Sequence, residues 1–237
     1  MASLVGSRVE RKEDKKLLTG RGKYTADVTF AHQTYAYFVR SPHARAQLKN
    51  VDISKAQKAP GVGAALTGKD IANDKIGGLI AGWRIKSEDG SDMKVPAHPP
   101  LANESVNYVG DHVAVVIAES LDEARNAAEL VKVDYKILKA VVKTDKAMDS
   151  ESIYKDIPKN LCFDWLLGDR AKTQEAFDKA DKIIKIDLIN NRLIPNAMEP
   201  RAANADYNPS TEEITLYTTS QNPHLARIII SAFNGVA

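Results

Sequence analysis

The chain has 237 residues, of which 43% are hydrophobic and 27% are charged, as in a globular protein of one or two domains. Its 33 basic and 31 acidic residues nearly balance, which argues against a nucleic-acid or membrane-surface partner. A single cysteine, Cys162, excludes an internal disulfide and an iron–sulfur cluster held by this chain alone, and the five histidines show no zinc-binding spacing.

The first 30 residues are rich in charge and poor in periodicity. Residues 11–19 predict a short helix that ends at Gly20, and residues 20–24 predict a turn in which glycine supplies a positive φ. The glycine pair lacks the spacing of a nucleotide-binding motif, so a turn is favoured over a phosphate site. No apolar signal segment or membrane-length run is present, and we therefore expect a cytoplasmic protein without a membrane span.

Three strands with short helical connections are predicted next. Alternating or β-branched stretches indicate strands at residues 34–40, 47–53 and 62–66, with a helix capped by Ser54 through Ala59 and a helical turn at residues 68–71.

Two side chains in this part have both a functional and a structural interpretation. His43 follows the break at Pro42; a catalytic base is one reading, but local hydrogen bonding is favoured. Residues 72–105 are rich in glycine and proline, which is typical of a functional loop or an interface crossing. Trp83, within this stretch, is expected to pack on a neighbouring domain rather than to stack on a ligand.

The clearest unit covers residues 106–135. The apolar run at residues 113–118 predicts a strand buried on both faces. Ser120 and Glu123 form a capping box for a helix whose apolar face is Leu121, Ala124, Ala128 and Val131, and residues 131–135 alternate as the next strand. Strand, helix and strand joined by short connections predict a parallel or mixed sheet layered with helix.

A second sheet unit is predicted to begin near residue 160. Residues 139–168 form a crossing segment, after which Asp169 caps a helix over residues 171–179 with Ala176, Phe177 and Ala180 facing inward. The alternation of isoleucine or leucine with charge at residues 182–190 predicts a half-buried strand, and residues 203–206 and 213–219 predict two more.

The last strand leads into a helix at a polar junction. Pro223 suits a first helical turn, Asn222 can cap that turn, and Leu225, Ile228, Ile229 and Ala232 recur at helical spacing. Gln221 therefore lies where a polar side chain and free backbone N–H groups can face a ligand.

Eight phrases in order and spacing resemble the large, molybdenum-binding subunit of the xanthine dehydrogenase and aldehyde oxidase family, most nearly the aerobic carbon-monoxide-dehydrogenase type. They are GRGKYTAD (20–27), VRSPHAR (39–45), PGV (60–62), YVGDHVA (108–114), AAELVKVDY (127–135), NLCFDW (160–165), MEPR (198–201) and TTSQNPH (218–224). The resemblance implies an α+β (mixed α/β) fold. We expect an N-terminal extension at 1–17, an α/β hammerhead domain at 18–142, a linker at 143–159 and the start of a molybdopterin-binding domain at 160–237.

The resemblance also implies oxidation of carbon monoxide or hydroxylation of an aldehyde or N-heterocycle with oxygen from water. The expected cofactor is a molybdenum–pterin, as molybdopterin cytosine dinucleotide. Iron–sulfur clusters and FAD are expected on a small and a medium partner subunit, in a dimer of heterotrimers. Gln221 matches the glutamine that hydrogen-bonds an oxygen or sulfur ligand of molybdenum, which agrees with the physics of an amide donor beside a metal–oxo group. Glu199 and Arg201 do not match the catalytic base and are expected to form an ion pair or a backbone clasp.

Several family segments have no match in this sequence, including the cofactor-facing glycine-rich loop and the catalytic glutamate, which is expected downstream. We therefore expect an N-terminal fragment with no catalytic residue or direct metal ligand of its own, inactive alone. The apolar residues 228–233 favour this interpretation over a non-catalytic docking module completed by partner chains. A degraded remnant is a third reading that no residue pattern supports.

Overall fold

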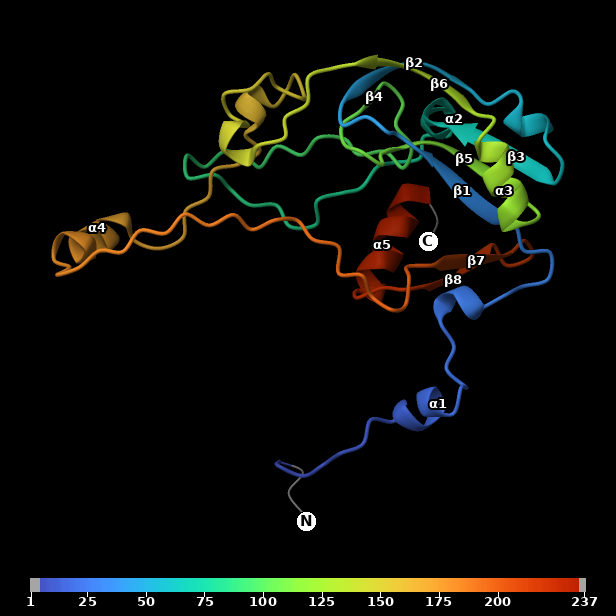
Figure 1. Ribbon diagram of the computed structural model, residues 1–237, viewed down its shortest axis with the longest axis horizontal. Coiled ribbons are helices and arrows are strands. Elements are labelled where there is room, and N and C mark those ends of the chain that lie inside the picture. The colour runs from blue at the N-terminus through green and yellow to red at the C-terminus, as the bar shows by residue number, and fades with distance from the viewer. Residues whose placement is uncertain (1–4, 235–237) are drawn as a thin grey trace. The chain divides into compact units, whose positions relative to one another are not determined.

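A buried apolar strand organises the larger part of the fold. The computed structural model describes residues 5–234. In it, β5 (His112–Ala118) lies between β1 (Tyr35–Arg40) and β3 (Val62–Thr67), and both pairs are antiparallel. The residues at 113–116 are all buried, as the apolar run predicts for a central strand. The helix α3 (Leu121–Ala128) packs on this sheet (Figure 1).

A second three-stranded sheet has the order β4-β2-β6 and is also antiparallel. Its strands are β4 (Ser105–Val106), β2 (Ala46–Asp52) and β6 (Lys132–Ile137). The prediction of a parallel or mixed sheet from residues 106–135 is therefore wrong. The chain crosses through α3 from one sheet to the other, so β5 and β6 pair with different neighbours.

Two clusters of small and β-branched side chains form the core, and Val39 contacts both. The first cluster places α3 on the β1-β5-β3 sheet and includes Val116, Ala127 and Ala128, whereas Leu121, expected on this face, is 52% exposed. The second cluster lies at the other sheet and includes Ala46, Val106 and Val113. The buried face of α3 thus consists of alanines, which let the helix approach the sheet closely.

The remaining helices are short and mostly begin where expected. The predicted helix at 54–59 is a single 3₁₀ turn whose N-cap is Lys55 and not Ser54. The Ser54 N–H donates to the Asp52 carboxylate at 2.9 Å. Asp169 caps α4 through its carboxylate, which accepts the Lys172 N–H at 3.0 Å. The helices are α1 (Asp14–Leu18), η1 (Thr25–Asp27), η2 (Ala56–Lys58), α2 (Gly68–Asn73), η3 (Thr144–Lys146), η4 (Pro158–Asn160), α4 (Arg170–Asp178) and α5 (Pro223–Asn234).

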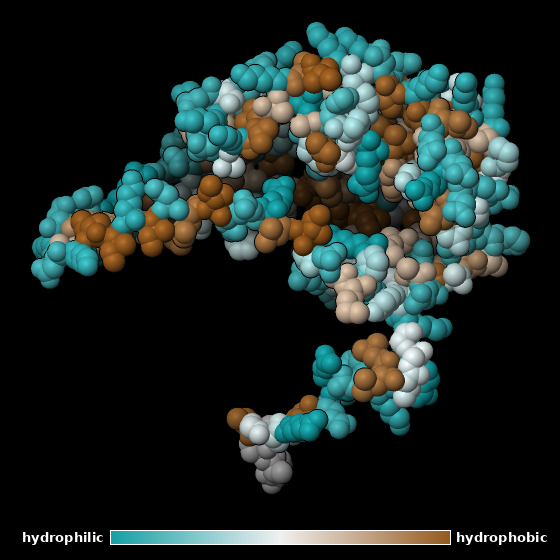
Figure 2. All heavy atoms as spheres, in the orientation of Figure 1, coloured by the Kyte–Doolittle hydropathy of each residue, from teal (hydrophilic) through white to brown (hydrophobic). Residues whose placement is uncertain are grey.

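The predicted strand at residues 182–190 is not formed, and the segment is extended without strand pairing among the described residues. Its apolar side chains are exposed, including Ile184 at 74% and Leu188 at 85%. Phe177, expected to face inward from α4, is 51% exposed. Figure 2 shows apolar residues gathered beside α4 and along the segment after it. Alternation predicts a strand only where a neighbouring strand supplies hydrogen-bond partners, and none of the described residues does so for this segment.

The chain divides into two compact units that are not contiguous in sequence. One comprises Met1–Gln33 with Asn190–Pro223, and the other comprises Thr34–Ile189 with His224–Ala237, within the described residues. The smaller unit contains the antiparallel hairpin of β7 (Ala203–Asn208) and β8 (Glu213–Thr218), both predicted from the sequence.

Candidate functional site

Gln221 lies between the end of β8 and the start of α5, as the sequence predicts. It is exposed, and no described residue makes a hydrogen bond with its side-chain amide. The Asn222 N–H beside it donates to the Ser220 hydroxyl at 3.1 Å, which closes a local turn. The junction thus presents a side-chain amide that no described residue engages.

Hydrogen bonds to Ala202 fix the end of the hairpin next to this junction. The Thr219 N–H donates to the Ala202 carbonyl at 3.2 Å, and the Ala202 N–H donates to the Thr219 hydroxyl oxygen at 3.0 Å. The residues that flank the hairpin on either side are thereby joined, and the turn that carries Gln221 begins from a fixed point.

A segment from the N-terminal part of the chain binds this hairpin, and we call residues 25–30 the N-terminal strap. The Glu199 carboxylate accepts the Thr25 N–H at 3.0 Å. The Asn204 amide donates to the Thr25 carbonyl at 3.1 Å and to the Val28 carbonyl at 2.8 Å. The ring of Phe30 lies 5.4 Å from that of Tyr217 on β8, measured between centroids.

The structure decides between the two expected roles of Glu199. Its carboxylate clasps the backbone of the strap, and among the described residues it forms no ion pair with Arg201. Asn204 also binds the backbone of the strap, and this role was not predicted from the sequence. Its only sequence signal is an asparagine in an alternating strand, a residue type that strands usually disfavour.

The other sequence candidates occupy structural positions. The His43 N–H donates to the Ser41 hydroxyl at 3.0 Å, and its ring meets Tyr135 edge-on at 4.8 Å, which fits the local role that was favoured. Gly20 has the expected positive φ of 69°. Cys162 is half-buried, and Trp83 is 85% exposed, so its packing on another domain stays a prediction.

A polar cavity of about 270 Å³ lies in the larger unit and was not predicted. The buried carboxylate of Asp111 accepts the Asn107 N–H at 3.1 Å, and burial together with this charge raises the pKa of Tyr108. The Tyr154 hydroxyl accepts a hydrogen bond from the Asn107 amide at 3.2 Å. Because Asn107 bonds to both Asp111 and Tyr154, these groups stabilise the loop around residues 97–111.

Neither a metal-binding cluster nor a membrane-spanning helix occurs in the described part of the chain. No three histidine, cysteine, aspartate or glutamate side chains within residues 5–234 converge as a metal site requires. No helix in the same range is long and apolar enough to cross a membrane.

Comparison with known proteins identifies the family of this chain. A sequence profile described as the aldehyde oxidase and xanthine dehydrogenase a/b hammerhead domain matches residues 19–139. The chain belongs to the aldehyde oxidase and xanthine dehydrogenase family. A second profile, for the molybdopterin cofactor-binding domain, matches residues 153–237, the part that contains Glu199 and Gln221.

Relatives within the family match almost all of the chain but only part of their own length. The nicotine 6-hydroxylase large subunit of Paenarthrobacter nicotinovorans is 33% identical over 98% of this chain and 28% of that protein. The carbon monoxide dehydrogenase large chain of Afipia carboxidovorans is 32% identical over 98% of this chain and 29% of its own. The crystal structure of quinoline 2-oxidoreductase from Pseudomonas putida 86 has a TM-score of 0.83 at 30% identity, over 98% of this chain and 29% of that one. The chain therefore spans less than a third of the length of these relatives.

Family membership confirms two predictions. The resemblance drawn from the eight phrases is correct, and so is the mixed helix-and-sheet fold, with a hammerhead domain followed by the start of a molybdopterin-binding domain. The domain limits and the role of Gln221 stay predictions.

Proposed function

We propose that the chain forms the front part of the large subunit of a molybdenum hydroxylase, which oxidises carbon monoxide or hydroxylates an aldehyde or an N-heterocycle with oxygen from water. Relatives named for nicotine, carbon monoxide and quinoline chemistry are similar to this chain over nearly its whole length, which supports the proposal. The single observation that carries it is the exposed amide of Gln221 at the β8–α5 junction, inside the region that matches the molybdopterin-binding profile.

In this proposal Gln221 is a hydrogen-bond donor to an oxygen or sulfur ligand of molybdenum. The residues present fit that use, since no described residue engages the amide and the hairpin fixes its backbone through Thr219 and Ala202. When bound, the molybdenum–pterin group would supply the redox chemistry. Gln221 would orient a ligand and stabilise developing negative charge, as an amide beside a polar metal ligand does.

The proposal includes the finer organisation predicted from the sequence. We keep an extension at 1–17, a hammerhead domain at 18–142, a linker at 143–159 and the start of the molybdopterin-binding domain at 160–237, although the second matched region begins at residue 153, within the proposed linker. Relatives named as a large subunit or a large chain support partner chains. We assign to these partners iron–sulfur clusters and FAD, in a cytoplasmic dimer of heterotrimers with molybdopterin cytosine dinucleotide.

The exposed segment at 182–190 supports a role within a larger polypeptide. Its alternating side chains are those of a half-buried strand, yet Ile186 is 70% exposed and Ile189 is 89% exposed. Strands of this pattern are stable when another strand covers them. We therefore propose that residues 1–237 are inactive alone.

The test is to purify the subunit that carries residues 1–237, together with the chains that accompany it, and to measure its molybdenum content and dye reduction with carbon monoxide, an aldehyde and an N-heterocycle. One of these substrates should support turnover, and Gln221→Ala should lower the rate roughly 10- to 100-fold. The matched control is Gln174→Ala, because Gln174 is an exposed glutamine on α4 that bonds only its neighbour Asp178 among the described residues.

Three outcomes would change the proposal. A subunit that binds iron–sulfur and flavin chains but no molybdenum would overturn the enzymatic role in favour of a docking module. Molybdenum without turnover on any of the three substrates would reject this substrate range. Equal rates for the two glutamine variants would remove Gln221 from the site and leave the rest standing.

A further inference from the structure

The segment that leads from the first profile-matched region into the start of the second is held in place by side chains to which no function has been assigned, and we call residues 139–160 the connector. The sequence predicts most of it as a linker, and its only regular structure is two 3₁₀ turns, η3 and η4. Its hydrogen bonds nevertheless involve Arg45 and Asn160, which both belong to the phrases that carry the family resemblance.

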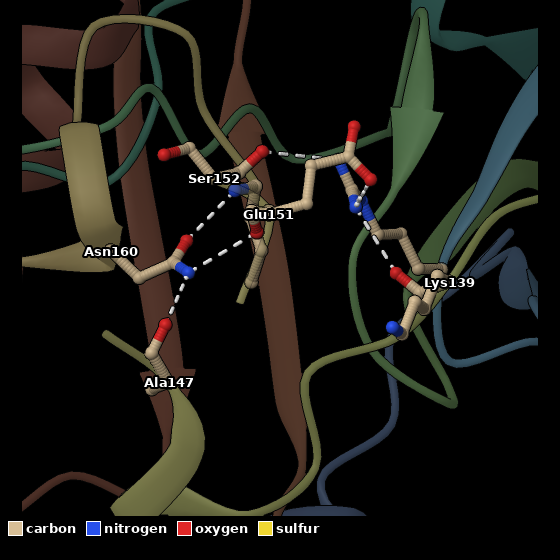
Figure 3. Close-up of polar contacts among 7 residues, drawn as sticks. Lys139, Ala147, Glu151, Ser152 and Asn160 are labelled. Carbon is tan, nitrogen blue, oxygen red and sulfur yellow. Dashed lines mark hydrogen bonds and ion pairs between the residues drawn. The ribbon is translucent and has the colours of Figure 1, made fainter. Parts of the chain in front are cut away.

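Asn160 ties the connector to itself through both ends of its side-chain amide (Figure 3). The amide oxygen accepts the Ile153 N–H at 2.8 Å. The amide nitrogen donates to the Ala147 carbonyl at 2.8 Å and to the Glu151 carbonyl at 3.2 Å. One side chain therefore replaces the backbone pairing that a helix or strand would provide.

The backbone at the same place is held in a conformation that a free loop would avoid. Lys159 and Asn160 both have φ of 57°, in the left-handed region that few residues other than glycine adopt. Asparagine tolerates this region, whereas lysine rarely adopts it, so the strain lies at Lys159; it costs on the order of 1 kcal/mol and persists only where surrounding contacts hold it. The Lys159 N–H donates to the Ser152 hydroxyl at 3.1 Å, which adds to the bonds made by Asn160.

Arg45 fastens this folded segment to the β4-β2-β6 sheet. It lies just before β2 and is only 8% exposed. Its guanidinium donates to the Lys139 carbonyl at 3.1 Å and to the Ser152 carbonyl at 3.3 Å, and one nitrogen lies 3.7 Å from the Glu151 carboxylate. A buried guanidinium is stable only when such acceptors replace its water.

Two further contacts hold the same stretch from other directions. Ile157 is 2% exposed, and the Tyr154 hydroxyl accepts the amide of Asn107. The connector is thus attached to the larger unit through an ion, an apolar side chain and a neutral hydrogen bond.

From these contacts we propose that Arg45 and Asn160 are positioning residues that make the connector a fixed strut rather than a flexible linker. The strut fixes the backbone position of the connector, through which the polypeptide passes from the hammerhead region to the molybdopterin-binding region. This inference rests on contacts within one compact unit and does not require the proposed activity.

Hydrogen exchange measured by mass spectrometry on the purified chain tests the proposal. In the wild type, peptides within residues 148–160 should exchange at least 10-fold more slowly than the unpaired segment at 182–190. Asn160→Ala should raise exchange in the connector at least 10-fold and leave β5 unchanged. Asn160→Gly should do the same although it relaxes the positive φ, because it also lacks the amide.

Arginine variants separate charge from geometry. Arg45→Lys keeps the charge but not the planar fork, so connector exchange should rise a few-fold, and this variant carries the test if Arg45→Ala does not fold. The matched controls are Asn126→Ala and Arg125→Ala, two exposed positions on α3. Fast connector exchange in the wild type, or Asn160 variants within twofold of it, would overturn the proposal. So would a rise in β5 exchange as large as that in the connector, which would indicate general destabilisation.

Discussion

Glu199 holds the N-terminal strap through a single hydrogen bond, so its effect can be isolated. Glu199→Ala should lower the free energy of unfolding of the smaller unit by about 1 kcal/mol, because the Thr25 N–H loses its acceptor. Glu199→Gln keeps a side-chain oxygen in the same place and should stay near the wild type. Urea unfolding and the exchange rate of the Thr25 amide measure both; equal losses in the two variants would show that the charge matters rather than the bond.

His112 makes the stability of the larger unit depend on pH. Burial, and then the nearby charge of Arg40, lower the pKa of His112, whose ring stacks on Phe38 at 4.6 Å. The unfolded chain therefore binds a proton more readily than the folded one, so stability is complete above a pH of about 6.5 and falls as the pH drops below it. The melting temperature measured between pH 8 and pH 5 should show this fall in the wild type.

Replacing the ring isolates that contribution. His112→Phe keeps an aromatic ring against Phe38 but cannot titrate, so the fall below pH 6.5 should become smaller. His32→Asn is the control, because His32 is exposed and asparagine tolerates its φ of 58°. A pH profile that is the same for His112→Phe and the wild type would contradict the assignment.

Sequence reasoning reached Gln221 and Glu199 at the residue level but not their surroundings. The junction of β8 and α5 follows from local pattern, whereas the partner of Glu199 is a backbone amide 174 positions away. Arg45 and Asn160 lie in recognisable phrases, yet most of their partners are main-chain carbonyls, which leave no signature in the sequence.

Among the elements, a glycine at the start of α2 permits a close approach that no other residue would. A Cβ on Gly68 would lie 2.3 Å from the Ala102 carbonyl oxygen, which is main chain and cannot move aside cheaply. Gly68→Ala should therefore lower the free energy of unfolding by roughly 1–3 kcal/mol, as overpacking does. Gly63→Ala on β3 is the control, because its nearest atom would be 3.9 Å away. Similar urea midpoints for the two variants would show that α2 shifts to accept the methyl group.

Local pattern predicted where β1, β2, β3, β5, β6, β7 and β8 lie, because alternation, β-branching and turn residues act over a few positions. It did not predict which strands pair, since pairing depends on which sheet the chain enters after α3. At the N-terminal end of α3, local pattern likewise predicted the capping residue Ser120 but not all of its hydrogen bonds. Its hydroxyl oxygen accepts the Glu123 N–H as predicted, while its hydroxyl hydrogen bonds the Glu123 carboxylate.

For the whole molecule, the uncovered segment at 182–190 has a measurable consequence. Exposed apolar segments promote association between chains. The double variant Ile186→Lys with Leu188→Lys should shift sedimentation of the isolated chain towards monomer at high concentration. The melting temperature should stay unchanged, because neither side chain is buried. Lys185→Ile with Asp187→Ile makes the same number of changes in the opposite sense and should increase association. If neither double variant changes sedimentation, the surface that causes association lies elsewhere.

The division into compact units is the property least accessible from the sequence. Residue patterns suggested consecutive blocks, but one unit joins the N-terminal strap to a hairpin near the other end of the chain. Periodicity carries no information about such distant pairing.

The strap's contacts also set a time order for synthesis. Thr25 and Val28 meet Glu199 and Asn204 across separations of 174 to 179 residues. At about 5–20 residues per second on the ribosome, the strap emerges roughly 10 to 35 seconds before its partners exist. During that interval the contiguous residues 34–189 can form both three-stranded sheets, while the first residues wait without a binding surface. Closing so long a loop is slow, so the smaller unit should fold after both three-stranded sheets, and its unpaired segments should be the more dependent on chaperones.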